Sequence, residues 1–192
     1  WLHDTIDPNE VTRYCELYDK VMVLSRFHRN LYREVEDEKF FVTRNGVDLS
    51  LFDQKVERIP YKIVYGSSYD RGLKDVLENW TKIKTRVPEA TLSIFYGWAS
   101  AEALNKHSSF KVYKEYMEHL MDQEGVTHLG RIGHEEVAHE YLSADIWAYP
   151  TWWPEISCIS AMKAQIGGAV PVVIPAAAVD ETVSYGYKTP QV

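Results

Sequence analysis

The sequence predicts an α/β protein built on a doubly wound parallel sheet, with a partial second αβ unit in front of it. Short apolar runs alternate with helix-length segments in which apolar residues recur every three or four positions, a pattern typical of βαβ crossovers. Of the 192 residues, 45% are apolar and 26% are charged, as in folded soluble domains. A charged stretch at residues 53–60 ends in proline and indicates a linker, so we divide the chain into residues 1–59 and residues 60–192.

The first unit contains two expected strands and one expected helix. Residues 20–25 and 39–43 are short apolar runs, and residues 26–35 between them carry apolar side chains at every fourth position. In so small a unit the strand edges near residues 21–24 and 40–42 would lack partners. Because uncovered strand edges invite pairing, we expect a homo-oligomer.

The second unit alternates strands and helices more strictly. We expect strands at residues 61–66, 91–97, 126–130, 145–149 and 170–174. We expect helices at residues 71–86, 110–123, 134–142 and 157–166, and the second should turn Val112, Tyr116, Leu120 and Met121 inward. In a parallel sheet the strands end at one edge, and ligands bind outside that edge. The residues just after Gly66, Gly97, Gly130 and Tyr149 are therefore the candidates for a functional site.

Charge and cysteine content exclude several classes of protein. With 21 Lys+Arg against 28 Asp+Glu, the formal net charge is −7, which argues against a nucleic-acid binder that relies on a basic face. Cys15 and Cys158 lie far apart without CxxC spacing, so we expect free thiols in the cytoplasm instead of a disulfide framework or a zinc-thiolate site. The sequence shows neither a transmembrane segment nor a signal peptide, and a peripheral position on a membrane is the alternative location.

The loop after the first strand of the second unit is a candidate phosphate site. It reads GSSYDRG from Gly66 to Gly72 and opens a helix with Arg71 at its start. Backbone N–H groups at a helix N-terminus and one guanidinium together suit a phosphate. The alternative is a simple turn in which Asp70 caps the helix. The GxGxxG fingerprint is absent here, which disfavours a nicotinamide enzyme.

The loop after residues 145–149 places a carboxylate directly before a helix. Glu155 at that edge of the sheet could accept hydrogen bonds from ligand hydroxyl groups. The free N–H groups of Ser157, Cys158 and Ile159 could face an anion beside it. The alternative is that Glu155 interacts only with the dipole of its own helix.

An ordered set of segments covering nearly the whole chain resembles a known family. The segments are Val126–Val137 (VTHLGRIGHEEV), Leu142–Pro150 (LSADIWAYP), Pro154–Val173 (PEISCISAMKAQIGGAVPVV), Val23–Phe27, Arg44–Asp48 with Phe52, and Trp1–Asp4. Together they resemble a family-four retaining glycosyltransferase of the GT-B class. The second unit corresponds to its Rossmann-like carboxy-terminal donor domain, and the first unit to part of its amino-terminal domain with the crossover between the two.

The resemblance implies retaining transfer of a sugar from a nucleotide-sugar donor to an unidentified acceptor, which is a glycan, a lipid or a small molecule. It implies no metal and no other cofactor. It gives catalytic roles to His3, which reaches toward the donor sugar, and to Glu155, which holds sugar hydroxyls. Arg71 would contact the donor diphosphate. The other donor-binding positions that it implies are Ser67, Gly130, Arg131, Ile132, Ser157, Cys158, Ile159 and Lys163.

Three departures from the family pattern qualify this interpretation. Ser67 stands where the family has an Arg, so one positive charge is missing. Lys163 stands where a second Glu would contact the ribose, and a Lys donates hydrogen bonds but cannot accept them. Lys163 either weakens donor binding or takes over a phosphate contact. The chain also lacks the first strands of the amino-terminal domain and the closing helices, so we expect a fragment of a larger protein or a reduced relative.

Three hypotheses about function remain open from the sequence. The first is a glycosyltransferase, and the second is a nucleotide-sugar-binding module without turnover. The third is an unrelated flavodoxin-like or epimerase-like α/β protein, which the absence of GxGxxG and of a suitable Tyr-xxx-Lys motif disfavours. Release of free nucleotide from nucleotide-sugars separates the first two.

Overall fold

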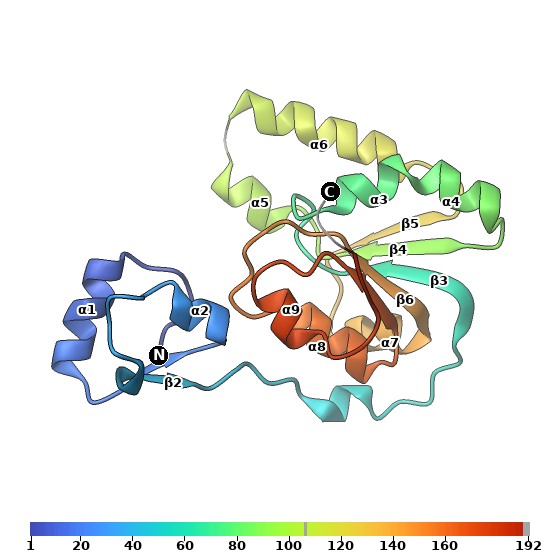
Figure 1. Cartoon of the computed structure of the whole chain (residues 1–192). Coiled ribbons are helices and arrows are strands. Elements are labelled where there is room, and N and C mark those ends of the chain that lie inside the picture. Colours follow the sequence, from blue (N-terminus) through green and yellow to red (C-terminus); the bar gives the residue numbers. More distant parts are fainter. Residues whose placement is uncertain (106, 190–192) are drawn as a thin grey trace.

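Two parallel sheets organise the chain in the computed structural model, which describes residues 1–105 and 107–189. The first sheet pairs β1 (Val21–Val23) with β2 (Phe40–Val42). The second sheet has six strands, β3 (Ile59–Tyr65), β4 (Thr91–Phe95), β5 (Val126–Gly130), β6 (Ala144–Tyr149), β7 (Val170–Val173) and β8 (Tyr187–Lys188). An extended segment with the short 3-10 helix η2 (Leu49–Phe52) joins the two parts of the molecule (Figure 1).

The large sheet has the strand order β5-β4-β3-β6-β7-β8, and every pair in it is parallel. Numbered from β3, this is the 3-2-1-4-5-6 order of doubly wound nucleotide-binding folds. The predicted fold class is therefore confirmed. The chain turns back on its own order between β3 and β6, and ligands of such sheets bind in the crevice at this switch point.

Helices cover both faces of this sheet. Figure 1 shows one layer made of α3 (Leu73–Glu78), α4 (Trp80–Arg86), α5 (Ala99–Leu104) and α6 (Ser108–Met121). The opposite layer contains α7 (His134–Ser143), α8 (Ile159–Ile166) and α9 (Ala178–Thr182). The strands between these layers are accordingly apolar on both sides, and Val64, Leu92, Ile94 and Trp147 are fully buried. No helix in the described part of the chain is long and apolar enough to cross a membrane.

The first part of the chain packs around its own small core. Helix α1 (Pro8–Leu17) sets Val11 and Cys15 against the inner face of β1 and β2. The sequence reasoning missed α1, although Asp7 caps it by accepting a hydrogen bond from the Asn9 N–H at 2.8 Å and Pro8 occupies its first turn.

The helix predicted at residues 26–35 is shorter in the structure, where α2 covers Arg26–Asn30. Ser25 is its N-cap, and the Ser25 Oγ accepts a hydrogen bond from the His28 N–H. Beyond Asn30 the backbone turns, and this turn brings both Tyr32 and Val35 into the small core.

Three further sequence predictions need correction. The expected helix at residues 71–86 is divided at Asn79 into α3 and α4. The expected inner face of α6 was wrong in part: Met121 is buried as expected, but Val112 is 66% exposed and Met117, which was not expected, is buried. The short elements α5, α9 and β8 were not foreseen. Strand β3 begins at Ile59, so the proposed boundary between residues 59 and 60 falls at its start; the division into domains stays a prediction.

One charged contact joins the small part to the large one. The carboxylate of Glu181 in α9 accepts hydrogen bonds from the backbone N–H groups of Arg26 at 3.0 Å and Phe27 at 2.6 Å. These N–H groups belong to the first turn of α2 and have no partner within that helix. Glu181 therefore fixes the start of α2 against the layer of α8 and α9.

Candidate functional site

The loops that follow β3 and β6 meet at the switch point of the sheet. Gly72 lies between the first loop and α3 with a φ of +98°, a backbone conformation that favours glycine. A Cβ added at Gly72 would lie 2.4 Å from the carbonyl oxygen of Pro150 in the second loop. Only glycine permits this approach, which brings Arg71 of the first loop beside Glu155 of the second.

The Glu155 carboxylate is held on one of its two oxygens. Its Oε1 accepts a hydrogen bond from Arg71 Nη1 at 2.8 Å and another from the Tyr149 hydroxyl at 2.6 Å. Ser67 Oγ in turn donates to the Tyr149 hydroxyl at 3.1 Å. The Glu155 N–H and carbonyl are bonded to Trp153 and Ala178. Oε2 receives no hydrogen bond from the residues that the structure describes, so it remains able to accept one from a ligand.

Arg71 is held by contacts on two sides and still has unused hydrogen-bond donors. Its guanidinium carbon lies 4.8 Å from the centre of the Trp153 ring, within the range of a cation–π contact. Burial opposes the charged guanidinium, but the neighbouring Glu155 carboxylate outweighs this and leaves the pKa of Arg71 raised. Its Nε is buried without a hydrogen-bond partner among the described residues, whereas Nη2, which has no such partner either, is not buried. An anionic ligand could therefore bind Arg71 without displacing Glu155.

A cavity of about 480 Å³, called here the Glu155 cavity, joins the two parts of the chain. His3, Asp4 and Asn45 line it from the first part. From the second part it is lined by Arg71, Glu155, Ser157 and Ile159. Five of the residues singled out from the sequence, which are His3, Arg71, Glu155, Ser157 and Ile159, thus lie around one space.

A second cavity of about 570 Å³, called here the Lys163 cavity, lies between the loop after β5 and helix α8. Arg131 and Ile132 line it from that loop, and Lys163 lines it from α8. Ile159, one turn before Lys163 on the same helix, lines both cavities. The residues predicted to form one donor site therefore divide between two adjoining cavities.

The remaining predicted positions do not line these two cavities. Ser67 is buried beneath Tyr149. Gly130 ends β5 with a φ of +67°. Cys158 is the N-cap of α8, so the helix starts later than the expected Ser157. Burial raises the pKa of the Cys158 thiol to about 12. Cys158 is thus a protonated, packed thiol at neutral pH.

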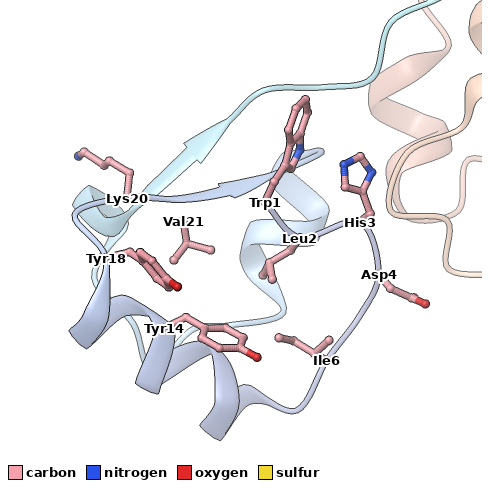
Figure 2. A pocket seen from close by; sticks show the side chains of 9 residues that line it. All are labelled: Trp1, Leu2, His3, Asp4, Ile6, Tyr14, Tyr18, Lys20 and Val21. Carbon is pink, nitrogen blue, oxygen red and sulfur yellow. The ribbon is translucent and has the colours of Figure 1, made fainter.

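Two side chains outside the predicted set of site residues shape this site. Tyr149 and Trp153 position Glu155 and Arg71, although only the place of Tyr149 at the end of an expected strand pointed toward the site. A further pocket of about 520 Å³ borders His3 and Asp4 and is lined by Tyr14, Tyr18 and other residues of the first part (Figure 2). Within residues 1–105 and 107–189, His, Cys, Asp and Glu side chains nowhere gather in threes as they would around a metal ion.

Comparison with solved structures identifies relatives in fold. The pneumococcal O-GlcNAc transferase GtfA, in complex with UDP and GlcNAc, is 14% identical, has a TM-score of 0.67 and matches 93% of this chain. HepE from Anabaena, in complex with UDP and glucose, is 14% identical, with a TM-score of 0.70 over 96% of this chain. A glycosyltransferase from Rickettsia africae is 16% identical, with a TM-score of 0.68 over 93% of this chain.

These similarities show that the chain has the Rossmann-like fold of GT-B glycosyltransferases. At such low identity they show the fold alone. The chain spans 35% of the length of GtfA, 54% of HepE and 52% of the Rickettsia protein. No protein-family model matches the sequence, and no curated protein matches it.

Proposed function

We propose that the chain provides the nucleotide-sugar-binding side of a glycosyltransferase that transfers a sugar, with retention, to a glycan, lipid or small-molecule acceptor. One observation carries the proposal. A carboxylate oxygen without a partner among the described residues, Glu155 Oε2, borders a cavity at the switch point, beside Arg71 and opposite His3. The fold supports it, because relatives in fold include proteins in complex with UDP and a sugar.

In this proposal Glu155 and Arg71 divide the donor between them. Glu155 Oε2 accepts hydrogen bonds from hydroxyls of the sugar. When the bond between the sugar and the diphosphate breaks, negative charge grows on the leaving diphosphate. Arg71 stabilises that charge through the Nη2 of its partly exposed guanidinium, which makes no hydrogen bond with a described residue, and no metal ion is required in this scheme. His3 faces the sugar from the other wall of the cavity, and Arg131 and Ile132 border the nucleoside.

The experiment is a calorimetric titration with UDP, GDP and ADP and with their glucose conjugates. A hydrogen bond to a charged group contributes about 1.5–3 kcal/mol, so Arg71→Ala should weaken binding of free nucleotide by roughly ten- to a hundredfold. Glu155→Gln should weaken the nucleotide-sugar but leave the free nucleotide within a few-fold, because that carboxylate faces the sugar. Glu89→Gln, an exposed change next to the opposite edge of the sheet, is the matched control.

Two results would contradict the proposal. One is that the wild-type chain binds no nucleotide and no nucleotide-sugar at millimolar concentration. The other is that Glu155→Gln weakens both ligands equally, which would place Glu155 away from the sugar. A chain that binds nucleotide-sugars but releases no free nucleotide with any acceptor would be a binding module without turnover.

A further inference from the structure

The Lys163 cavity is lined by cationic and hydroxyl groups and by no carboxylate. Its ionisable lining residues are Arg131, His134, Tyr96, Tyr141 and Lys163; of the described residues that border it, none is Asp or Glu. This contrasts with the adjoining Glu155 cavity, which contains Asp4 and Glu155. The chain as a whole is acidic, with a net charge of −7, so the charge of this cavity is local.

Lys163 is half-buried and unpaired. It projects from α8 into the cavity, and neither a hydrogen bond nor an ion pair joins its ammonium group to a described residue. Burial without a partner disfavours the charged ammonium and lowers the pKa of Lys163. Arg131, on the facing loop, likewise makes no ion pair with a described residue. Both cations would gain stabilisation from an anion in the cavity.

A neutral ribose is a poor match for this lining. Hydroxyl pairs on a sugar are commonly bound by groups that accept hydrogen bonds, and ammonium and guanidinium groups only donate them. Ser160, a hydroxyl on the wall, donates its proton to the carbonyl oxygen of Gly66 at 2.8 Å, so it can accept a hydrogen bond from a ligand, which the two cations cannot. A phosphate has several acceptor oxygens and negative charge, and it matches two facing cations.

We propose that the Lys163 cavity binds a phosphate group of the ligand, held between Lys163 and Arg131. This inference rests on the proposed function, because it takes the ligand to be the nucleotide-sugar that also contacts Glu155. Ile159 lines both cavities, so one ligand can extend from Glu155 to Lys163. The phosphate comes either from the donor's own diphosphate or from a further phosphate on its ribose. Lys163 is then a specificity-determining residue that selects an anion at this position.

The test is titration calorimetry with inorganic pyrophosphate, UDP and uridine 3′-monophosphate, at low and at physiological salt. Lys163→Gln should weaken binding of the preferred probe by roughly ten- to a hundredfold, and Lys163→Glu should weaken it further. Arg131→Gln, on the other wall, should also weaken it. Lys111→Gln removes one positive charge from a side chain that is 79% exposed on α6, and it should leave affinity within twofold.

The probes separate the two sources of phosphate. A Lys163-dependent preference for pyrophosphate and UDP identifies the diphosphate, and a Lys163-dependent preference for uridine 3′-monophosphate identifies a ribose phosphate. Equal affinity in wild type and Lys163→Gln, stronger binding by Lys163→Glu, or no binding of any probe at low salt would overturn the inference.

Failure of this phosphate-site inference can be told apart from failure of the proposed function. Loss of the sugar effect in Glu155→Gln, with Lys163-dependent pyrophosphate binding intact, removes the glycosyltransferase assignment alone. A retained sugar effect with no role for Lys163 removes this inference alone. Thermal unfolding of each variant shows that it is folded, and Lys163→Gln should not destabilise the chain because Lys163 has no described partner to lose.

Discussion

The contact between the two loops at the switch point should make Gly72 one of the most sensitive glycines in the chain. Gly72→Ala adds one methyl group, which would meet the Pro150 carbonyl oxygen at 2.4 Å. Both atoms belong to backbone or to a rigid Cβ, so neither can rotate away. The loops must separate, and Arg71 moves with the residue next to it.

The size of the effect follows from two contributions. A φ of +98° is costly for alanine, by about 1–2 kcal/mol, and the lower entropy of the unfolded alanine chain offsets about 0.4–1 kcal/mol of this. Forcing a methyl group into a packed space adds about 1–3 kcal/mol. Gly130→Ala is the matched control, because Gly130 also has a positive φ, +67°, but a Cβ there would meet nothing within 4 Å.

We therefore expect Gly72→Ala to lower the free energy of unfolding by about 2–4 kcal/mol and Gly130→Ala by about 1 kcal/mol. Urea unfolding followed by tryptophan fluorescence measures both values. Gly72→Ala should also weaken nucleotide binding in calorimetry, because Arg71 and Glu155 lose their alignment. If the two variants are equally stable, the close approach of the loops does not exist and the geometry of the site is wrong.

Two further predictions concern the first part of the chain. Glu181→Gln should lower the free energy of unfolding by about 0.5–2 kcal/mol and speed hydrogen exchange at the Arg26 and Phe27 amides, because it removes the charge bound at the start of α2; unchanged exchange at these amides would contradict the contact. Burial lowers the pKa of His28, so the unfolded chain takes up a proton that the folded chain refuses, and stability should fall as pH drops below the ordinary value of 6.5. His28→Gln should flatten this slope in urea unfolding between about pH 5 and pH 7, and an unchanged slope would refute the assignment.

The large sheet was predictable from the sequence because its strands are buried on both faces. Residues around Val64, Leu92 and Trp147 form continuous apolar runs, and such runs are recognisable without an alignment. The missed elements lack a comparable signal. Helix α9 has five residues and β8 has two, too few to show a period, and their burial depends on tertiary packing.

The candidate site was predictable in its location but not in its geometry. Parallel topology alone places the loops of Arg71 and Glu155 at one edge of the sheet. Their ion pair, however, joins residues that are 84 positions apart in sequence, and it depends on how closely their two loops approach each other. The sequence indicated Lys163 as a departure from a family pattern, but only the structure shows that its cavity is adjacent to that of Glu155 and lacks a carboxylate.

The ion pair between Arg71 and Glu155 is compatible with a binding role for both residues. The side chain of Glu155 is only 13% exposed, and burying its charge without a partner would be costly in free energy. Arg71 supplies that partner before any ligand arrives. Because the two partners bond through a single oxygen and the single nitrogen Nη1, Glu155 Oε2 and Arg71 Nη2 remain for a ligand. The bond thus preorganises an acceptor and a donor side by side, where a sugar hydroxyl and a phosphate oxygen would lie. Lys163 and Arg131, beyond Ile159, add further hydrogen-bond donors and no acceptor. A ligand that is neutral and rich in hydroxyls at one end and anionic at the other would therefore be oriented with its hydroxyls toward Glu155.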